Sequence, residues 1–339
     1  RKHIGALSNI GVRMKRFRPL LRAVMTAVLA APLLTVPHVA SAATDAFRGV
    51  NWADSRDNYV DGWVIPTGLT AGDSYNSVRA KADGIITGFQ QQLGANTVRL
   101  PVNPQSVTSD WWSRYKGAAD SALAHGMKVI FGYWEANKDG LVDDVAAWNT
   151  MWDQVTADYG GNGNVYFEPM NEPFGYSLNA WVSVCSTWLS RHSNIPRSRV
   201  LISGTGYNDN VTGVGAASAL NGTLLSLHFY GYWASDTTRA AWTTNLTNRL
   251  GSYSSRTIID EAGAPMTTGL DYSAGHQDGN AFTAYFAATT DLARSRQIGV
   301  VYWPGLRSGD TYSITRQSGG GLAVNNASGV AQLRWGWGL

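Results

Sequence analysis

From position 47 onward, short apolar stretches alternate along the chain with longer segments in which apolar residues recur at helical spacing. The short stretches are rich in β-branched residues, which favours β-strands. Eight predicted strands cover residues 47–53, 95–102, 128–134, 165–172, 199–206, 224–230, 257–263 and 299–305. Six predicted helices cover residues 75–93, 111–125, 142–159, 178–192, 237–253 and 280–296.

This alternation of strands and helices predicts an α/β protein with parallel strands and crossover helices. A closed barrel leaves no open sheet edge, so a single (β/α)8 TIM barrel is the predicted fold. An open doubly wound sheet is the alternative. Its nucleotide-binding forms need a glycine-rich phosphate loop, and no Gly-x-Gly-x-x-Gly follows the first strand.

Two segments fit the alternation less well. Residues 207–221 are rich in Gly, Ala and Asn and predict only a weak helix. Residues 306–339 contain three consecutive glycines and predict either a closing helix with loops or a short strand pair. Neither segment indicates a linker, an internal repeat or a second domain.

The N-terminal segment has the pattern of a secretory signal peptide. A basic stretch after Met14 precedes the apolar residues 23–36 and a small-residue cleavage pattern at 40–42. We therefore predict an N-terminal extension with a signal peptide over residues 1–42, a domain over residues 43–339, and a secreted, extracellular protein without membrane attachment after cleavage. An uncleaved anchor is the alternative, but prolines interrupt the apolar segment, which is short for a membrane span.

Removal of this leader reverses the charge of the chain. The whole sequence has 27 basic and 24 acidic residues, and the first 42 residues hold seven basic residues and no acidic one. The remaining 20 basic and 24 acidic residues give a formal charge of −4. We therefore expect no nucleic-acid partner. With a single cysteine the domain must be held by its core, and we expect a monomer.

Aromatic and acidic residues gather where the predicted strands end. The chain has 14 Trp and 15 Tyr, and flat aromatic faces stack on sugar rings as well as filling cores. In a β/α barrel the C-terminal strand ends form the active site. Glu172 ends strand four and Glu261 lies in strand seven, so their carboxyl groups can face each other across the barrel.

Such a pair suits cleavage of a glycosidic bond, which needs one acid and one carboxylate at the sugar's anomeric carbon. The separation of the carboxyl groups distinguishes a retaining reaction, at about 5–5.5 Å, from an inverting one, at roughly 6.5–9.5 Å. The sequence thus predicts a glycoside hydrolase.

The motifs around the two acids resemble those of glycoside hydrolase family 5 and the wider clan of retaining barrel glycosidases, along the whole domain. Asn171-Glu172-Pro173 matches the strand-four motif, which implies that Glu172 is the acid/base and that Asn171 donates to the sugar 2-hydroxyl. Glu261 matches the strand-seven nucleophile. Arg99, in Val98-Arg99-Leu100-Pro101, matches the strand-two motif, where its charge would lower the pKa of the nucleophile.

Three more residues extend the resemblance. His228 and Tyr230 match a His-x-Tyr motif on strand six, and Trp303 matches a sugar platform on strand eight. The chain departs from the family at strand three, where a His is expected and Tyr133-Trp134-Glu135 occurs. Trp134 is predicted to be a sugar platform as well. This departure bears on the sugar bound next to the cleaved bond, and therefore on the substrate.

Two further acids have structural interpretations. Glu168 lies four residues before Glu172, so on an alternating strand it points to the same inward side, where Arg99 is its expected partner. Asp260 neighbours Glu261 and should therefore point the opposite way, toward the helices. Glu135 and Asp139 suit either a sugar subsite or the capping of a loop.

The sequence has no His-x-His and no His-Glu-x-x-His motif, so we expect no metal and no cofactor. The leading prediction is a retaining enzyme that cleaves β-linked glucan-type or mannan-type glycans by double displacement. One alternative is an exo-acting glycosidase that removes terminal sugars. Another, from a different class, is a non-catalytic carbohydrate-binding barrel.

Overall fold

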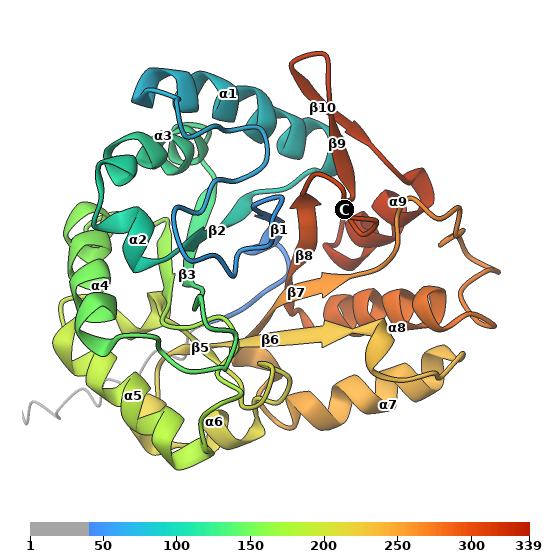
Figure 1. The fold of residues 1–339 in the computed structure, drawn as a ribbon. Helices are drawn as coiled ribbons and strands as arrows, with labels where there is room; N and C mark the ends of the chain where they lie inside the picture. Colours follow the sequence, from blue (N-terminus) through green and yellow to red (C-terminus); the bar gives the residue numbers. More distant parts are fainter. Residues whose placement is uncertain (1–40) are drawn as a thin grey trace, which may run out of the picture. The chain divides into compact units, whose positions relative to one another are not determined.

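The computed structural model describes residues 41–339, which fold into a closed barrel of eight parallel strands with helices around it (Figure 1). The strands are hydrogen-bonded in the order β4-β3-β2-β1-β8-β7-β6-β5, and a parallel bridge between Phe167 and Val200 joins the two ends of this series. They are β1 (Arg48–Trp52), β2 (Thr97–Val102), β3 (Lys128–Tyr133), β4 (Val165–Glu168), β5 (Leu201–Ser203), β6 (Leu224–Tyr230), β7 (Thr257–Gly263) and β8 (Gly299–Leu306). The predicted TIM barrel is confirmed.

Helices follow the strands and cover the outside of the barrel (Figure 1). Each of the six predicted helices is present, and a π-helical turn at Phe89–Leu93 continues the first of them. The α-helices are α1 (Tyr75–Gly88), α2 (Pro104–Val107), α3 (Asp110–Ala124), α4 (Val145–Tyr159), α5 (Leu178–Arg191), α6 (Thr212–Ala216), α7 (Arg239–Leu250), α8 (Ala281–Arg296) and α9 (Ala327–Gly336). Side-chain caps fix several N-termini: Asp144, for example, accepts a hydrogen bond from the Ala147 N–H and begins α4.

The ambiguous segments have short elements. Residues 207–221 contain only α6 and a 3-10 turn at Ser218–Leu220. The C-terminal segment has both predicted features, because the antiparallel pair β9 (Thr315–Ser318) and β10 (Gly321–Val324) precedes α9. The predicted signal peptide lies, except for its last two residues, outside the described residues. Within residues 41–339, no helix combines the length and the apolar character that a membrane crossing requires.

A bulge in β7 corrects the prediction for Asp260. Leu227 of β6 pairs with Ile259, but the next residue, His228, pairs with Glu261, so the register skips Asp260. The alternation of side chains therefore breaks, and Asp260 and Glu261 both point into the barrel. Asp260 is fully buried with Oδ1 2.6 Å from Ser226 Oγ, so the prediction that it faces the helices is wrong.

Candidate active site

A cleft of about 360 Å³ opens at the C-terminal ends of the strands. Both acids singled out in the sequence line it, together with aromatic residues from several loops. Its lining consists of Asp57, Tyr59, Trp134, Glu172, Tyr230, Tyr232, Glu261, Trp303, Arg307, Asp310 and Tyr312. Concave sites that combine aromatic walls with a few charged groups are typical binding sites for small polar ligands.

Glu172 and Glu261 face each other across this cleft. One carboxylate oxygen of each lies, with a ring nitrogen of His228, in a group of atoms all within 4.8 Å of one another. His228 Nδ1 is 2.8 Å from Glu172 Oε1 and 3.5 Å from Glu261 Oε2. The two carboxyl groups are therefore close enough to act on the same atom of a bound ligand.

Glu261 is the more buried of the two acids. Arg99 Nη1 donates to its Oε1 at 2.6 Å, and the Tyr230 hydroxyl donates to its Oε2 at 2.7 Å. Burial raises the pKa of Glu261, although the charges of His228 and Arg99 act to lower it. Arg99 thus acts in the expected direction, but desolvation outweighs it and the net shift is upward.

Arg99 is buried at the centre of a polar network. Its Nε donates to Glu168 Oε2 at 2.7 Å, as the sequence predicted. Its Nη2 donates to Asn171 Oδ1 at 2.7 Å, and its Nη1 also contacts Asn51 Oδ1 at 2.9 Å. Each nitrogen of the guanidinium is thus used, and the planar group holds β1, β2, β4 and β7 in one arrangement.

Glu172 lies just beyond the end of β4 and has hydrogen bonds with two side chains. The Tyr59 hydroxyl donates to its Oε2 at 2.8 Å, and His228 Nδ1 lies 2.8 Å from its Oε1. Asn171 Nδ2 in turn donates to the Tyr59 hydroxyl at 3.0 Å. Nothing in the sequence indicated a role for Tyr59. No periodic pattern points to this residue, because the loop brings it across the cleft to β4.

His228 lies beside both Glu172 and Glu261. Burial lowers its pKa, but the charge of Glu261 and the hydrogen bond and charge of Glu172 raise the pKa to about 9, with Asp260 a smaller contributor. We infer that the imidazole carries a positive charge near neutral pH, with Nδ1–H donating to Glu172.

Trp134 and Trp303 form one wall of the cleft. Their rings stack with centroids 5.4 Å apart at 25°, and the edge of Tyr59 packs against Trp134 at 4.6 Å. Only 3% of Trp134 and 8% of Trp303 is exposed, so each ring presents a narrow surface to a ligand. Trp134 occupies the strand-three position where the family resemblance led us to expect a His.

The two acids after β3 differ in role. Asp139 caps the loop, because its Oδ1 accepts from the Leu141 N–H at 3.0 Å. Glu135 is fully buried, and within residues 41–339 no side chain donates a hydrogen bond to its carboxylate oxygens. Burial and the charges of Glu172 and Asp143 raise the pKa of Glu135 to about 8, although the backbone N–H groups of Glu135 and Gly140 act to lower it.

Two groups of side chains have the spacing of metal ligands: one contains Glu168, His228 and Asp260, and the other Glu172, His228 and Glu261. Arg99 contacts a carboxylate of each group, at 2.7 Å in the first and 2.6 Å in the second. This fixed positive charge opposes a cation in either position. The arrangement suits hydrogen-bonded acids better than metal ligands.

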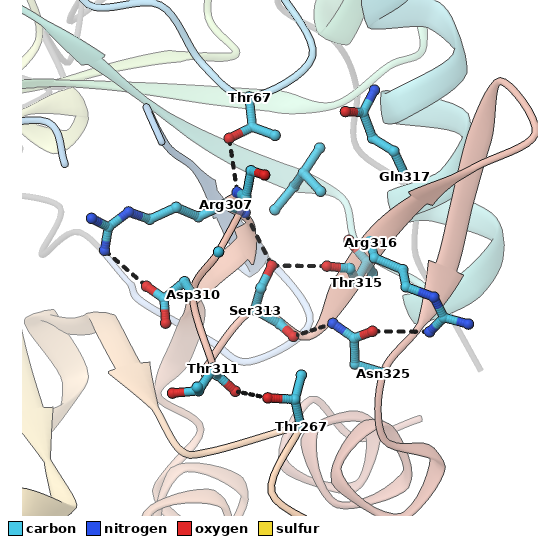
Figure 2. Close-up of a pocket in the computed structure, with 13 residues that line it drawn as sticks. Thr67, Thr267, Arg307, Asp310, Thr311, Ser313, Thr315, Arg316, Gln317 and Asn325 are labelled. Atoms are coloured by element: carbon cyan, nitrogen blue, oxygen red, sulfur yellow. Dashed lines mark hydrogen bonds and ion pairs between the residues drawn. The ribbon is translucent and has the colours of Figure 1, made fainter. Parts of the chain in front are cut away.

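A second cavity, of about 490 Å³, adjoins the cleft near β8 and β9 (Figure 2). Its polar side chains are largely paired with one another: Arg307 Nη1 donates to Asp310 at 2.9 Å, and Arg316 Nη1 donates to Asn325 at 2.9 Å. No aromatic ring lines it. The candidate catalytic acids and the aromatic rings therefore line the first cleft and not this cavity.

Comparison with protein families gives one match over most of the chain: the family described as Cellulase (glycosyl hydrolase family 5) matches residues 67–305. A comparison with curated protein sequences gives no match.

Solved structures with the same fold include endoglucanases, with little sequence identity to this chain. Cel5A (EG2) from Hypocrea jecorina is 17% identical, with a TM-score of 0.60 over 85% of this chain and 97% of that one. The catalytic domain of Thermobifida fusca endoglucanase Cel5A is 19% identical, with a TM-score of 0.56 over 86% and 92%. An endo-β-1,4-glucanase variant from Xanthomonas axonopodis pv. citri is 13% identical, with a TM-score of 0.58 over 86% and 99%.

Proposed function

The chain belongs to glycosyl hydrolase family 5, the cellulase family, and is a glycosyl hydrolase; from this premise we propose that it retains configuration at the anomeric carbon, with Glu172 as acid/base and Glu261 as nucleophile. The observation that carries the proposal is the close approach of the two acids, whose nearest oxygens lie within 4.8 Å. This upper limit lies below the roughly 6.5–9.5 Å of inverting enzymes, which need space for a water between the acids, and agrees with the shorter separation of retaining enzymes.

In the first step, an oxygen of Glu261 attacks the anomeric carbon and the bond to the leaving group breaks. Glu172 gives its proton to the departing oxygen, so the leaving group departs as a neutral alcohol. The donors on Glu261, Arg99 and Tyr230, keep it an anion until it attacks. The product of this step is a glycosyl ester on Glu261.

In the second step, the carboxylate of Glu172 removes a proton from water, and the water oxygen attacks the anomeric carbon. The ester bond breaks and Glu261 returns as a carboxylate. Two inversions at the same carbon give net retention. His228 lies against both acids throughout, and its charge partly balances whichever of them is ionised.

We assign the substrate as a β-linked glycan of the glucan or mannan type. The aromatic pair Trp134 and Trp303 suits the flat face of a sugar ring, and Asn171 Nδ2 lies beside Tyr59 where it can donate to a hydroxyl. The endoglucanase names of the structural neighbours support a glucan.

An exo-acting glycosidase is the second candidate. Tyr59 and Trp134 pack edge to face beside the cleft, and Lys138 Nζ lies 5.5 Å from the centre of the Tyr59 ring. If these groups close one end of the cleft, recognition of a chain terminus is favoured.

One experiment separates these possibilities from a non-catalytic binding barrel. The purified domain is incubated with aryl β-glycosides and with β-glucan and β-mannan polysaccharides, product lengths are recorded, and the anomer first released is identified by NMR. Release of the β-anomer from a β-linked substrate supports retention, and release of the α-anomer contradicts it. Internal cleavage indicates endo action, whereas monosaccharide release indicates exo action. Binding without any turnover would support the binding barrel.

Secretion forms part of the same proposal. The basic and apolar pattern of residues 14–42 supports it, and the expected mature N-terminus lies at Ala43. N-terminal sequencing of protein recovered from the culture medium of a secreting host tests it. Retention of the whole chain in the cell would contradict it.

A further inference from the structure

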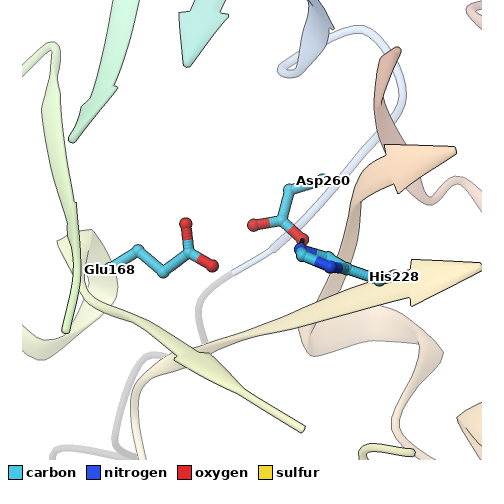
Figure 3. A group of neighbouring side chains, drawn as sticks. All are labelled: Glu168, His228 and Asp260. Carbon is cyan, nitrogen blue, oxygen red and sulfur yellow. Dashed lines mark ion pairs between the residues drawn. The ribbon is translucent and has the colours of Figure 1, made fainter. Parts of the chain in front are cut away.

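Asp260 lies inside the barrel, one step deeper than the two acids of the cleft, and neither step of the proposed reaction uses it directly. Figure 3 shows the side chains of Glu168 and Asp260 pointing toward each other across the barrel interior, with His228 beside Asp260. The hydroxyl of Ser226 lies between the two acids, 2.6 Å from Asp260 Oδ1 and 3.1 Å from Glu168 Oε1. These side chains are fully buried.

The hydroxyl of Ser226 cannot donate a hydrogen bond to both acids. Asn208 Nδ2 donates to Ser226 Oγ at 2.5 Å, and this orientation of the amide is fixed because Asn208 Oδ1 accepts from the Gly204 N–H at 2.6 Å. A hydroxyl has a single hydrogen. Ser226 can therefore donate to only one of its two acid neighbours. The acid that does not receive the Ser226 hydrogen must itself be protonated and donate to Ser226 Oγ. Otherwise its carboxylate oxygen and Ser226 Oγ repel each other.

Asp260 is the better position for this extra hydrogen. Glu168 Oε2 receives a charged hydrogen bond from Arg99 Nε at 2.7 Å, which stabilises its anion. Asp260 Oδ2 has no hydrogen-bond partner within residues 41–339, and Arg99 Nε is 3.6 Å away. A buried anionic oxygen without a donor is costly. Burial and the charge of Glu168 raise the pKa of Asp260 to about 8, against the opposite effects of Arg99 and His228.

The charges around Asp260 agree with a neutral acid. β1 and β5 contribute the uncharged side chains Asn51 and Ser203. If Asp260 is neutral and Glu172 holds the proton that it must donate, two positive groups balance two negative ones. Ionised Asp260 would leave one buried negative charge uncompensated. The charged groups that face Asp260 are Arg99 of β2, Glu168 of β4 and His228 of β6, whereas Glu261, the next residue of β7, pairs with Arg99.

We propose that Asp260 is a positioning residue that holds a proton on its Oδ1, donates it to Ser226 and so leaves the charges of Arg99 and His228 to act on Glu261. This role rests on the proposed function of Glu261 as nucleophile. Loss of the proton would place a second anion beside Arg99, which would then be shared between Asp260 and the nucleophile. The neutral acid thus keeps the donor geometry at Glu261 in place.

Neutron diffraction of the deuterated wild-type protein near neutral pH locates this proton directly. The expected result is two deuterons along the chain from Asp260 through Ser226 to Glu168, one of them on Asp260 Oδ1. A single deuteron, or a deuteron on Glu168 instead, would overturn the proposal. This measurement uses no substrate, so it remains decisive even if the protein hydrolyses no glycoside and the proposed function fails.

The consequence for catalysis is tested with Asp260→Asn, whose amide resembles the neutral acid but cannot ionise. We expect kcat on an aryl glycoside near pH 6 to stay within about threefold of wild type, because the contact with Ser226 is retained. From about pH 6 to 9 the ratio of the variant's kcat to that of wild type should rise, because Asp260 loses its proton only in the wild-type protein, whereas Glu172 titrates in both. Asp153→Asn, an exposed acid on α4, is the matched control and should leave the profile unchanged.

Two results would overturn this part. One is a folded Asp260→Asn protein that is inactive at every pH, because the anion would then be required. The other is a ratio of the two kcat values that stays constant over this pH range. Circular dichroism establishes whether the variant folds, and if it does not, the neutron map of the wild-type protein still decides where the proton lies.

Discussion

Arg99 Nη1 lies 2.6 Å from Glu261 Oε1, while Nε of the same guanidinium lies 2.7 Å from Glu168 Oε2. One buried cation therefore serves two buried carboxylates, one in the cleft and one below it. Removal of Arg99 should leave both anions without a counter-ion. The network thus links the stability of the barrel to the chemistry of the cleft.

Arg99→Ala should reduce the free energy of unfolding by about 3–5 kcal/mol, the usual cost of breaking a buried ion pair from one side. Denaturant unfolding measures this loss. Arg191→Ala is the control: Arg191 pairs with Asp153 at 2.5 Å on the surface, where both side chains are nearly half exposed, and its loss should leave the free energy of unfolding almost unchanged. Equal losses in the two variants would contradict the buried network.

Glu261→Ala should abolish hydrolysis, because no carboxylate remains to attack the anomeric carbon. Added azide can occupy the vacated space and attack the sugar itself. The product of a β-glycoside should then be the α-glycosyl azide, formed by one inversion, and NMR identifies it. Unimpaired hydrolysis by the variant would refute the assignment of Glu261.

Glu172→Ala should have a different signature. An activated aryl glycoside needs little protonation, so the glycosyl ester should still form, but its hydrolysis should be slow because no base activates water. We expect a burst of aryl alcohol, a lower KM, and rescue by azide that gives the β-glycosyl azide. An α-azide from this variant would indicate that the roles of the two acids are exchanged.

Much of the barrel could be predicted from the sequence, because its strands are apolar segments of limited length between helices of regular period. The same regularity placed Arg99, Glu172 and Glu261 at strand ends that converge on one cleft. Glu168 was paired correctly with Arg99, although β4 ends at Glu168 and the regular strand assumed in that prediction does not reach Glu172.

The predictions failed where the regular alternation of strand residues breaks down, at a bulge and in a loop. Asp260 was placed on the wrong face because the bulge in β7 depends on the register with β6, which the sequence of β7 alone does not contain. Tyr59 was missed because an irregular loop carries it to Glu172. Arg99 lowers the pKa of Glu261 as expected, but the net rise of that pKa could not be predicted, because it depends on how completely the folded chain removes water from the carboxyl group.

Tyr230→Phe should move the acid limb of the pH profile. The hydroxyl stabilises the anion of Glu261 at 2.7 Å and so lowers its pKa. Its removal should raise that pKa, so Glu261 becomes ionised only at higher pH. A hydrogen bond to a charged group contributes about 1.5–3 kcal/mol, which corresponds to an upward shift of roughly one to two pH units.

The profile of kcat/KM against pH measures this shift. Tyr75→Phe is the matched control, because the Tyr75 hydroxyl also donates to a carboxylate, Asp120 Oδ2 at 2.7 Å, but between α1 and α3 on the outside of the barrel. It should leave the acid limb in place. A downward shift in the Tyr230 variant would contradict the donor role of the hydroxyl.

Glu135→Gln tests the buried acid after β3 through stability. The pKa of Glu135 rises to about 8 in the folded protein, above its unfolded value near 4.5. The stability that this group contributes is therefore fully present below about pH 4.5 and is lost as pH rises toward 8. The slope of this loss is at most about 1.4 kcal/mol per pH unit for one proton. Glutamine cannot ionise, so the variant should lack this part of the pH dependence.

Unfolding free energies of both proteins at several values between pH 5 and 9 give the comparison. Asp260 and His228 also have raised pKa values, so wild-type protein and variant should both lose stability with pH, but the variant less steeply. The difference in free energy of unfolding between wild-type protein and variant should therefore become smaller, or change sign, as pH rises. Parallel curves would mean that Glu135 is already ionised in the folded protein, and that a donor absent from the described contacts stabilises its charge.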